Sequence, residues 1–270
     1  MKRFYMIISV VLLTLTLLTG CIKPQTELPI STKPSVSATD PNAESSTDPE
    51  TVDTTIPASE TGSADTEGVA SSCYTDAVYA TQIERYCTAV SQQWDENAYW
   101  DHEMSSLAAY YYEGTPLENV GFTFIDLDRD GICELVIGAI MGAQRDPLVF
   151  EIWTLRYDEP VMLAQSGSHN RYYLQYSEED DLWSVAYEAE NGAANHAVYY
   201  LHLVDGEFRV IQGIVFDAIA SENDPWFMAC DLDWDVSNDI PIDENTATAV
   251  ITAGRKIYTA QNYIPYSQYK

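Results

Sequence analysis

Hydrophobic side chains recur at every second residue along most of the stretch from residue 122 to residue 232, and this alternation limits the fold more than any other feature. It predicts strands over residues 122–127, 134–140, 148–156, 161–165, 171–176, 182–188, 196–204, 207–216 and 226–232. Asp205-Gly206, between two of these runs, is a strong signal for a two-residue hairpin. Because strands that follow one another through short turns pair antiparallel, the sequence predicts an antiparallel sheet of roughly eight strands.

Two other segments have helical periodicity. Between residues 75 and 113, apolar side chains recur at spacings of three and four, with a break at residues 94–97, and Gly114 predicts where the second helical stretch ends. A last helix is predicted over residues 243–258, with Asp243 as its N-cap. The expected class is therefore α+β, with N-terminal helices packed on the sheet and a C-terminal helix.

The N-terminus has the layout of a bacterial secretion signal. Lys2 and Arg3 precede an apolar run over residues 4–18, and small residues then lead to Cys21. This closely resembles the lipobox of bacterial lipoproteins, in which the cysteine is diacylated and becomes the mature N-terminus. The resemblance implies a signal peptide over residues 1–20, lipidation at Cys21, and a place on the cell membrane facing the extracellular side. A plain cleaved signal and a short transmembrane anchor are the alternatives, although a span needs ~20 apolar residues.

Composition changes directly after this cysteine. Residues 21–72 are crowded with Ser, Thr, Pro, Asp and Glu and hold few large apolar side chains, so they predict a disordered acidic stalk. Residues 73–270 are rich in Tyr, Trp and β-branched side chains, and they are numerous enough for one globular domain. The net charge of −29 argues against nucleic acid and anionic glycans as partners. It fits cation uptake or simple solubility.

An acidic loop between two predicted strands is the one motif with a chemical mechanism. Its carboxylates stand at alternate positions, and Gly131 lets the chain turn where a side chain would clash. Hard cations such as Ca²⁺ take six to eight oxygen ligands, which clustered carboxylates supply. The sequence predicts a Ca²⁺ site that clamps a hairpin. Its expected ligands are the side chains of Asp126, Asp128, Asp130 and Glu134 and the carbonyl of Ile132.

This loop is not a full EF-hand, because the twelfth residue counted from Asp126 is Ile137 and not Glu. It resembles the shortened calcium loops of integrin-type propeller repeats, in which a DxDxDG turn joins two strands; the resemblance covers the loop and not the fold. An acidic hairpin turn without metal is the alternative. Against that alternative, three carboxylates in one turn repel one another unless a cation or hydrogen-bond donors offset them.

A second acidic run, Asp231, Asp233 and Asp235, repeats this spacing but has Val236 at the sixth position in place of Gly. It is the weaker metal candidate, and a solvated strand end is its alternative. Four cysteines of the exported domain could form two disulfides in three connectivities: Cys73, Cys87, Cys133 and Cys230. Cys133 also fits a small buried apolar residue, and no Cys or His spacing suggests zinc.

The chain as a whole resembles a group of lipobox-bearing surface lipoproteins of Gram-positive, gut-dwelling bacteria. The likeness is carried by the lipobox and stalk, a helical region ending Tyr-Tyr-Tyr-Glu-Gly, the Asp-rich strand-loop-strand and the closing Ile264-Pro-Tyr. No activity is assigned to that group, so it implies architecture and the loop alone. We expect a lipid-anchored surface protein whose domain binds a protein or glycan ligand, and no catalytic constellation is predicted. The alternatives are an extracellular hydrolase of polymers and an accessory or sensory subunit of an envelope complex.

Overall fold

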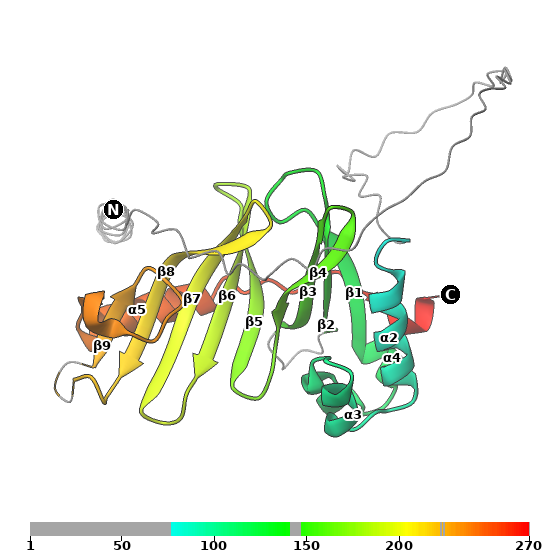
Figure 1. Cartoon of the computed structure of the whole chain (residues 1–270), viewed down its shortest axis with the longest axis horizontal. Coiled ribbons are helices and arrows are strands. Elements are labelled where there is room, and N and C mark those ends of the chain that lie inside the picture. Colours follow the sequence, from blue (N-terminus) through cyan, green and yellow to red (C-terminus); the bar gives the residue numbers. More distant parts are fainter. Residues whose placement is uncertain (1–76, 141–146, 222, 224, 270) are drawn as a thin grey trace, which may run out of the picture. The chain divides into compact units, whose positions relative to one another are not determined.

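An antiparallel sheet of eleven strands dominates the computed structural model, which describes residues 77–140, 147–221, 223 and 225–269 (Figure 1). The strand order is β10-β9-β8-β7-β6-β5-β3-β2-β1-β11, and β4 pairs with β3 beside this path. The strands are β1 (Val120–Ile125), β2 (Glu134–Ala139), β3 (Leu148–Arg156), β4 (Glu159–Gln165), β5 (Asn170–Ser177), β6 (Leu182–Glu190), β7 (Asn195–Val204), β8 (Glu207–Asp217), β9 (Trp226–Ala229), β10 (Ile240–Pro241) and β11 (Ile264–Pro265).

The alternating pattern located the nine longer strands, and the large antiparallel sheet is confirmed. The expected number of roughly eight strands was too low, because β10 and β11 have two residues each and pair only at the sheet's margins. Two residues are too few for an alternating pattern to appear. The last predicted strand is also shorter than expected: it ends at Ala229, ahead of the second acidic run.

The helices are α2 (Ala80–Ser91), α3 (Glu96–Asp101), α4 (Pro116–Asn119) and α5 (Glu244–Arg255), with 3₁₀ helices η1 (Ser106–Tyr111), η2 (Val236–Asn238) and η3 (Tyr266–Gln268). The N-cap prediction for α5 is confirmed, since Asp243 Oδ1 accepts a hydrogen bond from the amide of Thr246 at 2.9 Å. Within the described ranges, no helix has the length and apolarity that a membrane crossing requires. The predicted signal peptide, Cys21, the stalk and Cys73 lie outside the described residues.

The helical stretch predicted to run from the break at residues 94–97 to Gly114 is instead two pieces, α3 and η1. Glu103 separates them in a left-handed backbone conformation, with φ of 55°, that a right-handed helix cannot contain. Just after it, the amide of Ser105 donates to the buried Glu151 carboxylate at 3.0 Å rather than to a helical carbonyl. A tertiary contact therefore overrides the helical periodicity at this point.

Both faces of the sheet carry a hydrophobic core. On one face, buried side chains of α2, α3 and η1 pack with those of β1, β2 and β3, and Val250 and Ile251 of α5 pack against the same cluster. On the other face, buried residues of β2, β3 and β5 to β9 form a second cluster, which Leu127 and Val236 join from the two acidic loops. Figure 1 shows α2, α3 and α4 gathered near β1, and α5 near β8 and β9. Each acidic loop is thus anchored in the second core by one apolar side chain.

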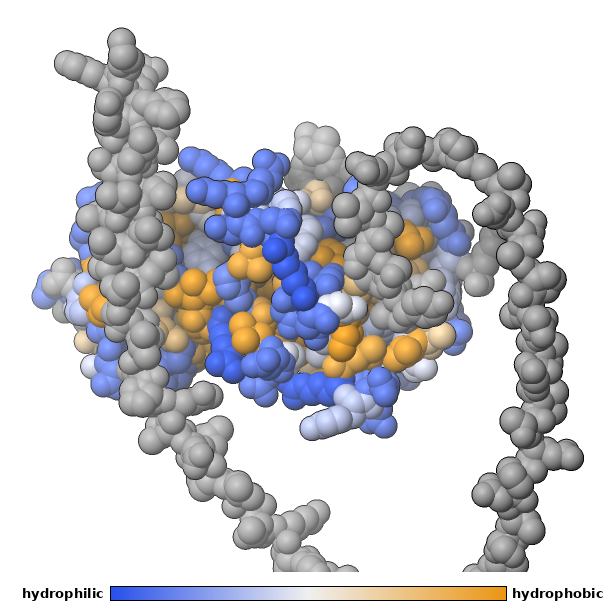
Figure 2. Space-filling view, turned by 90° about the horizontal axis from the view of Figure 1, so that it is seen from above, coloured by the Kyte–Doolittle hydropathy of each residue, from blue (hydrophilic) through white to orange (hydrophobic). Residues whose placement is uncertain are grey.

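Arginines link the turns at one end of the sheet. Arg129, in the loop after β1, forms an ion pair with Asp181 in the turn between β5 and β6. Arg156, at the end of β3, donates to the carbonyl of Gly206, in the turn between β7 and β8, at 2.6 Å. Seen from above, hydrophilic side chains cover much of the visible surface, with smaller hydrophobic areas between them (Figure 2). This end of the sheet is where the first acidic loop lies.

Candidate metal centre

Three of the predicted metal ligands come together in the loop between β1 and β2. Asp126, Asp128 and Asp130 each place one carboxylate oxygen so that the three atoms lie within 4.8 Å of one another. Asp126 and Asp128 are partly buried, and Asp130 is exposed. Atoms that each lie 2.3–2.6 Å from the same Ca²⁺ ion are at most about 5 Å apart, so this spacing allows all three oxygens to contact one cation.

The loop's own backbone orients these carboxylates. The amide of Gly131 donates to Asp126 Oδ2 at 3.1 Å, and the amide of Ile132 donates to Asp130 Oδ1 at 2.7 Å. Asp130 N lies 3.4 Å from Asp128 Oδ1, at the long end of hydrogen bonding. Gly131 has φ of 89°, a conformation that glycine adopts without steric cost. These bonds fold the loop back on itself, so alternate side chains point to one centre.

One oxygen of this centre lacks any partner. Asp126 Oδ1 is buried, and no hydrogen-bond donor in the described part of the chain reaches it. The basic side chain of the loop, Arg129, is not paired with these carboxylates, because it forms an ion pair with Asp181. Burial raises the pKa of Asp128 above its usual value, and the neighbouring carboxylates of Asp130 and Asp126 raise it further. The loop therefore concentrates negative charge that its own side chains do not neutralise.

Glu134, the fourth predicted carboxylate ligand, does not belong to this group of three. It is 1% exposed at the start of β2, where Oε2 accepts from the amide of Leu127 at 2.9 Å and Oε1 from the hydroxyl of Thr154 at 2.9 Å. Burial raises the pKa of Glu134 to about 7, although these two hydrogen bonds oppose the shift. The Glu134 carboxylate thus links the acidic loop, through the amide of Leu127, to β3, through the hydroxyl of Thr154.

Ile132, whose carbonyl is the fifth predicted ligand, has a side chain 38% exposed at the end of the loop. Thr154, on β3, is the residue of this neighbourhood that sequence analysis did not find. It lies twenty positions along the chain from Glu134, and only the pairing of β2 with β3 brings the two together. A buried Thr in a strand gives no signal of such a role, because Thr is also an ordinary strand residue.

The second acidic run does not form a comparable centre. Asp233 Oδ1 accepts from the amide of Asp235 at 2.9 Å, and Asp235 Oδ1 accepts from the amide of Ser237 at 3.0 Å. Among the residues that the structure describes, the group at residues 126–130 is the only set of three acidic, His or Cys side chains with the spacing of a metal site. The carboxylates of Asp233 and Asp235 stabilise consecutive turns instead.

The described cysteines fall into two kinds. Cys133, directly before β2 and fully buried, and Cys230, directly after β9, are both disulfide-bonded. Cys87, on α2, is a free and partly buried thiol whose pKa is raised by burial. The expectation that Cys133 could be only a buried apolar residue is therefore corrected.

The chain matches no protein-family model, and it has no significant match among the curated proteins or the solved structures.

Proposed function

We propose that this chain is a lipid-anchored extracytoplasmic surface protein whose α+β domain binds a ligand or partner, and that Ca²⁺ holds the loop between β1 and β2. The lipid anchor and the surface location rest on the lipobox-like segment that ends at Cys21. The metal proposal rests on three carboxylates whose oxygens lie close together and on a buried oxygen of Asp126 that has no hydrogen-bond partner among the described residues. A divalent cation would supply the positive charge that Arg129, paired with Asp181, does not.

The ion's role in this proposal is structural. The loop joins two adjacent strands, and its carboxylates accept hydrogen bonds from the loop's own amides. Asp126, Asp128 and Asp130 would hold the ion, with the Ile132 carbonyl and water completing the six or more oxygens that Ca²⁺ prefers. Glu134 would act from outside the ligand shell, by fixing the amide of Leu127.

The melting temperature of the purified protein in EDTA, in Ca²⁺ and in Mg²⁺ tests the metal proposal. A ligand at a hundredfold excess over Kd stabilises the native state by about 2.7 kcal/mol, or about 5–10 °C for a domain of this size. We expect that rise with Ca²⁺ and a smaller one with Mg²⁺, which demands a stricter octahedral geometry.

Two matched variants locate the site. Asp128→Asn keeps an oxygen that can accept from the amide of Asp130 but removes one charge, and it should abolish the rise. Asp233→Asn makes the same change in the second acidic run, where the oxygen accepts from Asp235, and it should leave the rise intact. An equal Ca²⁺ response in both variants would show that the ion binds elsewhere. No response in the unmodified protein would mean that the loop is an acidic hairpin turn without metal.

The anchor is tested separately. Expressed in a Gram-positive host, the unmodified chain should partition with membranes and incorporate labelled palmitate, whereas Cys21→Ser should do neither. Palmitate incorporation by the Cys21→Ser variant would contradict the lipobox interpretation.

A further inference from the structure

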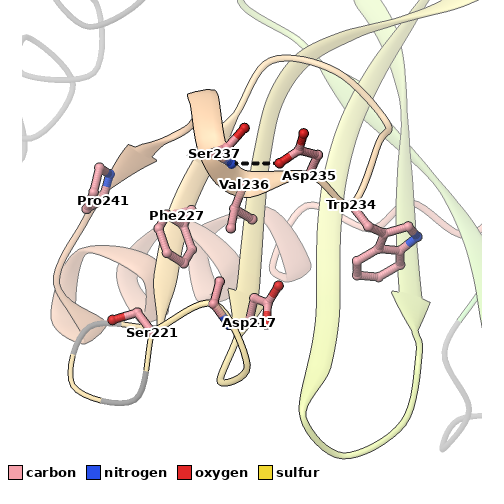
Figure 3. Close-up of a pocket in the computed structure, with 9 residues that line it drawn as sticks. Asp217, Ser221, Phe227, Trp234, Asp235, Val236, Ser237 and Pro241 are labelled. Carbon is pink, nitrogen blue, oxygen red and sulfur yellow. Dashed lines mark hydrogen bonds between the residues drawn. The ribbon is translucent and has the colours of Figure 1, made fainter.

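A cavity of about 600 Å³ lies at the edge of the sheet formed by β8, β9 and β10. Its lining residues come from a later part of the sequence than the candidate metal centre. It is formed where β8 ends, by the segment that follows it, by β9 and by the loop leading into η2 and β10 (Figure 3). A volume of this size falls in the range of small-molecule sites, and it is far larger than a single metal ion needs. Nine residues line it: Asp217, Ala220, Ser221, Phe227, Trp234, Asp235, Val236, Ser237 and Pro241.

The walls of this cavity combine apolar surface with aromatic rings. Phe227 and Val236 are 7% and 9% exposed and belong to the core on this face of the sheet, so they form a firm base. The indole of Trp234 is partly buried at another side of the hollow (Figure 3). Such surfaces favour a ligand with an apolar body, and an indole face also attracts cations.

The charge of the cavity has a single sign. Two lining residues are acidic, Asp217 and Asp235, and the nine described residues of the lining include no Lys, Arg or His. Asp217 is 7% exposed, and its Oδ1 accepts from the amides of Ile219 and Ala220 at 2.8 and 2.9 Å. Asp235 Oδ1 accepts from the amide of Ser237 at 3.0 Å, as Figure 3 shows. Both carboxylates are therefore held in place by the backbone of their own turns.

This arrangement selects among ligand classes. An anionic ligand would meet two carboxylates with no basic side chain of the lining to offset them, and like charges at close range are costly. A purely apolar ligand would gain nothing from the buried carboxylate of Asp217. A protonated amine with an apolar body satisfies both halves of the site, because its N–H groups can bond to carboxylate and hydroxyl oxygens while its body contacts Phe227 and Trp234.

We infer that this cavity is a binding site for small organic amines, with Asp217 as the residue that recognises the ammonium group. The inference rests on the proposed binding role of the domain and gives its ligand a chemical class. It does not depend on the proposed Ca²⁺ site, because none of the lining residues belongs to the loop between β1 and β2.

Three probes that share a phenyl body but differ in charge test the site: 2-phenylethylamine, 2-phenylethanol and phenylacetate. Titration calorimetry at pH 7 should give saturable binding of the amine, at least about tenfold weaker binding of the alcohol, and no binding of phenylacetate. The titrations are run in EDTA, so a failed metal site and a failed amine site give separate results. Equal affinities for the amine and the alcohol, or no saturable amine binding, would overturn the inference.

Three variants assign the recognition to this cavity. Asp217→Asn keeps an oxygen for the amides of Ile219 and Ala220 and should lower the preference for the amine at least about fivefold. Ser237→Arg adds a positive charge at an exposed rim position, where folding should be preserved, and should abolish amine binding. Asp158→Asn removes a charge from the exposed turn between β3 and β4 and should change nothing. Amine binding that survives both Asp217→Asn and Ser237→Arg would show attraction to the protein's overall negative charge and contradict the site.

Discussion

The two acidic loops of this chain have the same spacing of Asp residues but different structures. In the loop between β1 and β2, three carboxylates converge, and the sixth residue is Gly131 with φ of 89°. In the loop after β9, Asp233 and Asp235 cap successive turns, and the sixth residue is Val236, which packs into the core. The comparison shows that the spacing of the Asp residues alone does not bring three carboxylates together. The backbone conformation at the turn decides whether alternate side chains meet.

The loops also differ in how the sheet holds them. The first is tied by a buried carboxylate, because Glu134 accepts from the amide of Leu127 and from the hydroxyl of Thr154. The second is tied by a neutral group, the hydroxyl of Tyr199, which donates to the carbonyl of Asp233 at 3.2 Å. A buried carboxylate makes stronger hydrogen bonds but loses its hydration, so the first tether should be both stronger and sensitive to pH.

Removal of the carboxylate tether should have the largest effect. Glu134→Ala leaves the amide of Leu127 and the hydroxyl of Thr154 without their acceptor and opens a small void, so we expect a loss of about 3 kcal/mol in the free energy of unfolding. Tyr199→Phe removes only the hydroxyl that holds the second loop and should cost about 1 kcal/mol. Urea denaturation in EDTA measures both. Equal losses from the two substitutions would mean that the two tethers contribute equally to the free energy of unfolding.

The pattern of the sequence was sufficient for the sheet but not for the details of the site. Alternation predicts strands because side chains of successive residues face opposite sides, and it located β1 to β9 to within a few residues. Alternation could not predict which way the Glu134 side chain points. Every residue of β2 is buried, so odd and even positions there do not divide into core and solvent. Nor could alternation predict the amine cavity, whose lining comes from segments that only the pairing of β8 with β9 brings together. The helical break at Glu103 likewise depends on Glu151, a residue of another element.

The pH dependence of stability separates the two tethers further. The pKa of Glu134 rises from an ordinary 4.5 to about 7 on folding, so the native state binds the proton more tightly than the unfolded chain. Its contribution to stability is therefore complete below about pH 4 and is lost as the pH rises through 7. In EDTA, we expect the unmodified protein to lose about 2 kcal/mol relative to Glu134→Gln between pH 5 and pH 8.

Denaturation curves of both proteins across this range check that prediction. Asp233→Asn, in the second loop, serves as the control and should follow the unmodified protein at every pH. A constant difference between the unmodified protein and Glu134→Gln would show that Glu134 stays ionised when buried, in contradiction to its raised pKa.

An exchange of the sixth residues is the most direct test of the comparison, and the effect of Gly131→Val on stability should be smaller than that of Glu134→Ala. Gly131→Val forces a β-branched side chain to a positive φ, so we expect a loss of about 1–2 kcal/mol in EDTA and the disappearance of the Ca²⁺-dependent rise in melting temperature. Val236→Gly should lose about 2–3 kcal/mol through lost packing in the core but gain no response to Ca²⁺. The first loop's carboxylates converge because Gly131 turns the chain beneath them and Glu134 fixes the amide of Leu127. The second loop has Val236 and Asp239 at the corresponding positions, so a Ca²⁺ response in Val236→Gly would mean that the glycine builds the site without a glutamate at the position of Glu134.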